Sequence, residues 1–206
     1  MESTFPLLFA AVLGFTHAFE ADHLVAVSSI VTKRDRVTLA VKDGIFWGLG
    51  HSSTILLIGG LMILGSATFL NGYFSYFEAI VGAMLIILGI FRIYQLLVPT
   101  TDNTAIYSSS HHHHLAYGVG LVHGLAGSGA MVLLVMSQSG QSAYSLLYLL
   151  IFGLGSVIGM LTAAGVLGLP LAQKALHHAG LRVGLILLSA LLCIGYGSYV
   201  LIEQLS

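Results

Sequence analysis

The 206-residue sequence contains very few charged residues, which make up only 7% of the chain. A soluble domain carries about 25% charged residues, because its surface must be wetted by water. So small a share cannot cover a water-facing surface, and 57% of the residues are hydrophobic. The composition excludes an ordinary soluble domain and predicts that lipid surrounds most of the protein.

Other features that are scarce exclude further classes. Cys193 is the single cysteine, so no disulfide can form within the chain. A formal net charge of −1 argues against nucleic acid as a partner. The sequence has no phosphate-binding P-loop, so we do not expect it to hydrolyse ATP. Residues 1–15 contain no Lys or Arg, unlike the basic start of a signal peptide, so we expect the first apolar segment to be retained.

Long apolar runs, by contrast, are abundant. A helix needs about 20 apolar residues to cross a bilayer core about 30 Å thick. Six stretches meet this requirement, and we predict an all-α, polytopic membrane protein with six transmembrane helices. The predicted spans are Phe5–Val31, Val37–Ser66, Tyr73–Val98, Leu115–Ser137, Ser142–Leu169 and Val183–Glu203.

All seven basic residues lie at alternate connections between these spans. The first connection is flanked by four of them, the third by one and the fifth by two: Lys33, Arg34, Arg36 and Lys42; Arg92; Lys174 and Arg182. With six spans these connections share one side of the membrane, which the positive-inside rule assigns to the cytoplasm. We therefore expect a multi-pass protein of the cell membrane with both termini outside the cytoplasm.

The two halves of the sequence resemble each other. Gly14-Phe15-Thr16-His17 matches Gly120-Leu121-Val122-His123, and Trp47-Gly48-Leu49-Gly50 matches Phe152-Gly153-Leu154-Gly155. Chance recurrence of Gly and Leu is the alternative explanation. Each half has three spans, an odd number, so a duplicated second half must be inverted, as in many transporters. We predict inverted three-helix repeats at residues 1–98 and 115–206, joined by a polar, histidine-containing cytoplasmic loop at 99–114.

The first span contains an unusual cluster of ionisable residues, His17, Glu20, Asp22 and His23. Each charged group at a bilayer centre costs about 2.5–3.5 kcal/mol, a cost that a bound cation would offset. At 100° per residue, both histidines and Glu20 share one stripe of a helix, but Asp22 points about 140° away from His17. Either the helix is distorted here, or Asp22 holds an imidazole by a hydrogen bond.

The second span adds His51, which lies at a similar depth in the membrane if the spans are antiparallel neighbours. A single membrane histidine more often bonds to another helix, but this group of residues favours a metal site made by His17, Glu20, Asp22, His23 and His51. Imidazole suits nickel, cobalt, zinc and copper, and the lack of thiolates argues against a soft-metal cysteine site. Residue types alone do not choose among these metals.

The second half has lost most of these groups. Ser128-Gly129 aligns with Asp22-His23, and Ser156 aligns with His51. We infer that one half binds the ion while the other moves against it or lines its path. His123 remains, and a hydrogen bond to a neighbouring helix and a transient ligand role both fit it. His123 and Ser52 are therefore candidate residues of the transport path.

Two further groups have several explanations. A histidine tetrad falls in the predicted cytoplasmic loop and consists of His111, His112, His113 and His114. Such a run can gather divalent ions weakly, but it can also be an ordinary polar loop or part of an engineered tag. Glu78, near the outer end of the third span, could admit cations, although a charge at the membrane interface is the simpler interpretation.

Two motifs resemble those of the nickel/cobalt transporter (NiCoT) superfamily. His17-x4-Asp22-His23 resembles its first signature, and Gly50-His51-Ser52-Ser53 resembles its second. The six-span form and the sequence HAFEADHLVAV are most similar to the UreH-type branch, with the HupE type more distant. The resemblance implies uptake of nickel or cobalt that feeds nickel-enzyme maturation proteins, and functional roles for His17, Asp22, His23 and His51. The chain departs from the eight-span family pattern, which leaves the choice of metal and the direction of transport open.

We therefore predict a non-enzymatic transporter whose substrate is Ni²⁺ or Co²⁺ and which holds no prosthetic group. One alternative is a membrane-embedded zinc hydrolase that uses His17-x2-Glu20-x2-His23, although the HExxH spacing is absent. Another is a metal-binding accessory subunit that does not transport. The sequence does not indicate an oligomeric state or the source of energy.

Overall fold

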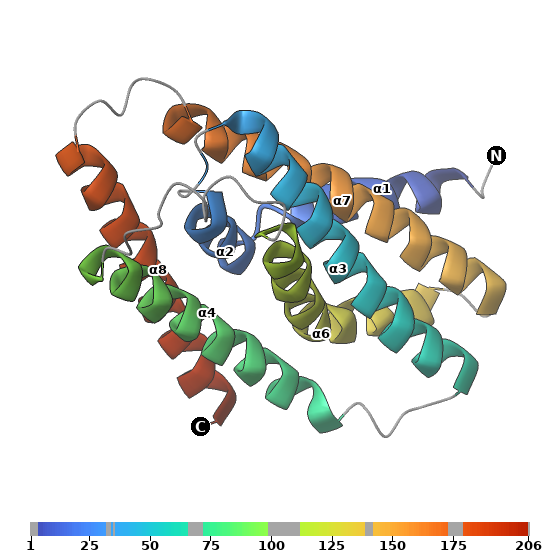
Figure 1. Cartoon of the computed structure of the whole chain (residues 1–206). Coiled ribbons are helices and arrows are strands. Elements are labelled where there is room, and N and C mark those ends of the chain that lie inside the picture. Colours follow the sequence, from blue (N-terminus) through green and yellow to red (C-terminus); the bar gives the residue numbers. More distant parts are fainter. Residues whose placement is uncertain are drawn as a thin grey trace.

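The computed structural model describes residues 4–31, 34, 36–65, 72–98, 112–138, 142–172 and 179–205. Within these ranges the chain folds into seven α-helices (Figure 1). They are α1 (Thr4–His17), α2 (Ala21–Val31), α3 (Val37–Gly65), α4 (Phe74–Leu97), α6 (His112–Gln138), α7 (Ser142–Ala172) and α8 (Ala179–Leu205).

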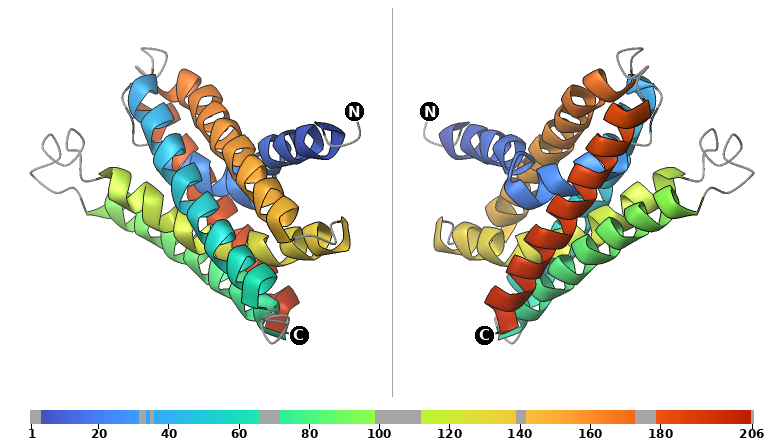
Figure 2. Two further views of the ribbon diagram at one scale, coloured as in Figure 1. Left: turned by 90° about the vertical axis from the view of Figure 1, so that its right-hand side faces the viewer. Right: turned by 90° about the vertical axis from the view of Figure 1, so that its left-hand side faces the viewer.

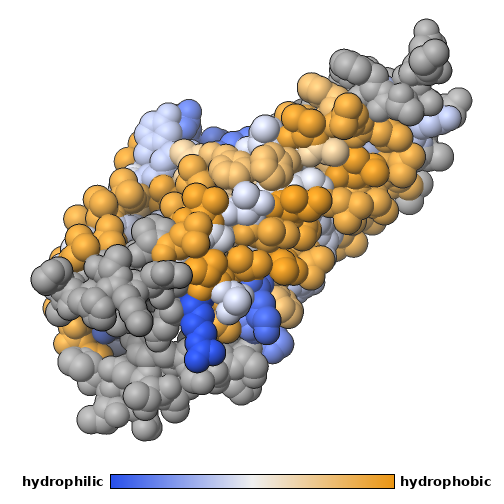
Figure 3. Space-filling view, turned by 90° about the horizontal axis from the view of Figure 1, so that it is seen from above, coloured by the Kyte–Doolittle hydropathy of each residue, from blue (hydrophilic) through white to orange (hydrophobic). Residues whose placement is uncertain are grey.

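Four of these helices, α3, α4, α7 and α8, are long and apolar enough to cross a membrane. They agree closely with four of the predicted spans. α6 corresponds to a fifth predicted span, but the side chains of its second half lie outside the described residues. Hydrophobic residues cover most of the described surface visible in Figure 3, as lipid contact requires. The part of the chain that the structure describes is all-α, and its long apolar helices indicate a membrane protein.

The first predicted span, Phe5–Val31, is not one continuous helix, and the distortion that the sequence left open is present. α1 ends at His17 and α2 begins at Ala21. In the intervening turn the amide of Glu20 donates to the carbonyl of His17 at 3.1 Å, a tighter pairing than in an α-helix. The hydroxyl of Thr16 donates to carbonyls of the preceding turn, which is a bond that bends helices. The break therefore forms without Pro or Gly.

α3 and α6 run side by side in the same direction. Gly120 lies against the backbone carbonyl of Trp47, and one turn further along both helices Gly124 lies against the carbonyl of His51. A Cβ at either glycine would collide with the opposing backbone, so glycine allows the helices to touch. This contact fixes the depth of His51 relative to α6.

α1 and α7 make a similar parallel contact. Gly155 lies against the carbonyl of Ala11, and Gly159 lies against the carbonyl of Phe15. α4 and α8 also pack closely, but they run in opposite directions.

α2 contacts α3, α4, α7 and α8, and Figure 2 shows it near the middle of the bundle. Buried residues that include Val27, Trp47, Leu85 and Met160 form the core around it.

Gly120→Ala is expected to lower stability, because the added methyl group would meet the Trp47 carbonyl and force two backbones apart. Overpacking of this kind costs about 1–3 kcal/mol. Gly118→Ala is the matched control, since a Cβ there meets open space on the same helix. The apparent melting temperature in detergent is the measurement, and equal values for the two variants would contradict the close contact.

Candidate metal centre

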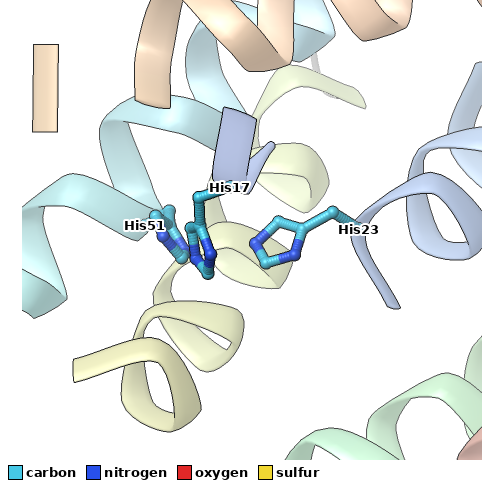
Figure 4. A group of neighbouring side chains, drawn as sticks. All are labelled: His17, His23 and His51. Carbon is cyan, nitrogen blue, oxygen red and sulfur yellow. The ribbon is translucent and has the colours of Figure 1, made fainter. Parts of the chain in front are cut away.

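Four buried imidazoles meet beside the break between α1 and α2, and we call them the histidine cluster. They are His17 at the end of α1, His23 in α2, His51 in α3 and His123 in α6, with exposed fractions of 7%, 1%, 0% and 1%. The His23 ring lies among the others, with its centroid 4.6 Å from those of His17 and His123 and 5.1 Å from that of His51. Figure 4 shows His17, His23 and His51 turned toward one another from three helices.

The ligand atoms of this cluster form two overlapping groups. One ring nitrogen from each of His17, His23 and His51 lies within 4.8 Å of the others. A carboxylate oxygen of Asp22 and nitrogens of His23 and His123 satisfy the same limit. Because His23 belongs to both groups, an ion could pass between them without losing every ligand.

Most ring nitrogens of the histidine cluster have no hydrogen-bond partner among the described residues, and this includes Nε2 of all four rings. A buried polar atom without a partner costs about 1–3 kcal/mol. Native proteins rarely retain such atoms unless they serve a function. Several lone pairs gathered in one buried place therefore fit a site for a divalent cation.

Asp22 orients the central ring. Its Oδ1 lies 2.9 Å from Nδ1 of His23 and also accepts the backbone amide of that residue. A carboxylate on Nδ1 fixes the ring and leaves Nε2 for a metal ion. The other oxygen of Asp22 lies 3.4 Å from Nε2 of His123. The helix break thus brings Asp22 to a face that an unbroken helix would have denied it.

Two other predicted residues lie at the edge of the cluster or outside it. Glu20 has Oε1 2.8 Å from Nδ1 of His17, but its side chain is 58% exposed. The hydroxyl of Ser52 donates to the carbonyl of Gly153 at 2.9 Å, which ties α3 to α7. Ser52 therefore has a helix-joining bond in place of a free hydroxyl.

The histidine tetrad belongs partly to α6, which begins at His112. His111 lies outside the described residues, as does the side chain of His112. Nδ1 of His113 lies 2.8 Å from Oδ1 of Asp43, whose carboxylate also accepts a bond of 2.7 Å from Nη2 of Arg34. Asp43 and Arg34 are buried, so His113 is engaged in an ion-pair cluster, while His114 is exposed.

Sequence reasoning missed two aromatic residues that enclose the histidine cluster. The Trp47 ring lies 5.5 Å from His23 and 5.7 Å from His123, and the Phe152 ring lies 5.5 Å from His17. Trp47 and Phe152 occupy equivalent positions in the two similar halves of the sequence. That equivalence is the signal that could have identified them.

Two curated proteins resemble this chain. The urease accessory protein UreH of Bacillus sp. (strain TB-90) is 36% identical over 187 residues, which covers 84% of this chain and 82% of the relative. The hydrogenase nickel incorporation protein HupN of Bradyrhizobium diazoefficiens is 32% identical over 108 residues, which covers 50% of this chain and 26% of that protein. The first relative is named as an accessory protein and the second as a nickel incorporation protein.

No protein-family model matches the sequence, and no solved structure matches the chain. The match to the Bacillus protein nevertheless extends through more than four-fifths of both chains. This chain, whose long apolar helices indicate a membrane protein, belongs to the family of the urease accessory protein UreH.

Proposed function

We propose that this chain carries a divalent transition-metal ion, nickel in particular, across a membrane through the histidine cluster. One observation supports the proposal most strongly. Four buried imidazoles meet where α1, α2, α3 and α6 come together, and Nε2 of each ring has no hydrogen-bond partner among the described residues. The relatives, one named a urease accessory protein and one a hydrogenase nickel incorporation protein, support nickel as the substrate. Cobalt has the same ligand preferences and remains the second candidate.

The ligand chemistry supports a borderline divalent ion. Imidazole nitrogens bind nickel, cobalt, copper and zinc well, whereas magnesium and calcium prefer oxygen. The single thiol, Cys193, bonds to the carbonyl of Val25 and is not part of the cluster. The ligands come from four helices, so movement of one helix can weaken the site and release the ion.

We further propose that the chain consists of two inverted three-helix repeats that rock about this site, with α1 and α2 together forming the first crossing. The glycine contacts support this arrangement. Gly14 lies against Phe152, and its equivalent Gly120 lies against Trp47, the equivalent of Phe152. Transporters of this type place substrates at broken helices near the midplane. Both termini then lie outside the cytoplasm, and a reporter fused after Ser206 that proved cytoplasmic would contradict this topology.

Purified protein in liposomes is expected to accumulate nickel, as measured by a metal-sensitive dye trapped inside. An inside-negative potential should speed accumulation, because 100 mV contributes about 2.3 kcal/mol for each charge moved. Liposomes without protein are the control. A protein that binds nickel but accumulates none under any gradient would contradict transport and would favour the accessory role.

A further inference from the structure

A cavity of about 500 Å³ lies beside the histidine cluster, between α2, α4 and α8. Four carboxylates line it: Glu20 in the turn before α2, Asp22 in α2, Glu78 in α4 and Glu203 in α8. No Lys or Arg is among its described lining residues. We call it the carboxylate cavity.

Two buried histidines also line this cavity and connect it to the histidine cluster. His17 and His23 are each more than nine-tenths buried, and Nε2 of both rings lacks a hydrogen-bond partner among the described residues. Glu20 and Glu203 are exposed, and Glu78 is half-buried. The cavity therefore leads from accessible oxygen donors to buried nitrogen donors.

We propose that the carboxylate cavity is an antechamber that captures a hydrated divalent cation and delivers it to His17 and His23. This inference rests on the proposed function, in whose topology α8 ends on the outer face. Carboxylates in a cleft with low-dielectric walls focus the electric field and raise the local concentration of cations. Oxygen donors also bind Mg²⁺ and Mn²⁺, so capture is unselective and the imidazoles select the metal.

Trp47 provides a direct way to measure capture. It is the only tryptophan in the chain, and its ring lies 5.5 Å from that of His23. Nickel that reaches the histidine cluster is expected to quench its fluorescence. Stopped-flow mixing of Ni²⁺ with purified protein thus gives the association rate without any need for transport, so failure of the antechamber and failure of the proposed function give different results.

The test variant is Glu78→Gln with Glu203→Gln. We expect nickel association and initial uptake at low nickel to fall about tenfold, which is at the lower end of the range for electrostatic focusing. Quenching at saturating nickel should still reach completion, because the imidazoles are intact. Excess Mg²⁺ should slow association in the unmodified protein and have little effect in the variant.

Two further variants, which add one carboxylate inside or outside the cavity, provide the matched control. Gln204 also lines the carboxylate cavity, so adding Gln204→Glu to the double variant should recover part of the lost rate. Gln95→Glu adds the same charge near the other end of α4 and should recover nothing. An unchanged association rate in the double variant, or equal recovery by both added charges, would overturn the antechamber.

Discussion

His23→Ala should abolish nickel uptake and reduce nickel affinity by more than about 100-fold, beyond the loss typical of a residue that only supports a ligand. His23 has the central ring of the histidine cluster and belongs to both groups of ligand atoms. Its removal therefore disrupts both groups together. Uptake into liposomes and quenching of Trp47 by nickel are the two measurements.

Two companion variants sharpen this result. Asp22→Asn should lose about 10–100-fold in affinity, because it removes the carboxylate that orients His23 and keeps the ring itself. His114→Ala changes an exposed histidine of α6 and should match the unmodified protein at saturating nickel. If the folded His23→Ala protein transports nickel at the normal rate, the metal path lies elsewhere.

Asp43→Ala should destabilise the fold by about 3–5 kcal/mol, the usual cost of leaving a buried charge without its partner. The Asp43 carboxylate pairs with Arg34 and accepts from His113, and thereby joins the start of α3 to the start of α6. The expected result is a large drop in apparent melting temperature and in the yield of folded protein.

Lys42→Ala is the matched control for Asp43→Ala, because Lys42 is the preceding residue of α3 and its side chain is exposed. This substitution should change the free energy of unfolding by no more than about 0.5 kcal/mol. Removing both charges with Arg34→Met and Asp43→Leu should restore part of the stability, since an apolar pair leaves no buried charge. Equal melting temperatures for Asp43→Ala and Lys42→Ala would show that the ion pair contributes little.

The helices could be predicted from the sequence because membrane burial depends on local hydropathy. α3, for example, covers Val37–Gly65 against a predicted Val37–Ser66. The break between α1 and α2 was one of two options, because an unbroken helix could not aim Asp22 at the ligands around His17. The structure has both features, since α1 ends at His17 and Asp22 Oδ1 also lies 2.9 Å from Nδ1 of His23.

Contacts between distant segments were beyond the reach of sequence patterns. The pairing of His113 with Asp43 joins residues 70 positions apart, so the sequence left the tetrad open between metal recruitment, an ordinary polar loop and part of an engineered tag. The placement of Glu203 beside Glu20 in one cavity depends on how α8 packs against α2. His123 could not be assigned for the same reason, since its neighbour His23 comes from the other half of the chain.

If His17 and His23 hold the ion as proposed, the break at residues 18–20 is expected to limit how tightly the protein binds it. His17 precedes the turn and belongs to the helix packed on α7, whereas His23 follows it and belongs to the helix packed on α8. A bound ion would clamp these two pieces together, and each 1.4 kcal/mol of clamping would lengthen its residence about tenfold. In the proposed transporter, a turn that opens between the two ligands would separate them and release the ion, so weaker binding would accompany faster turnover.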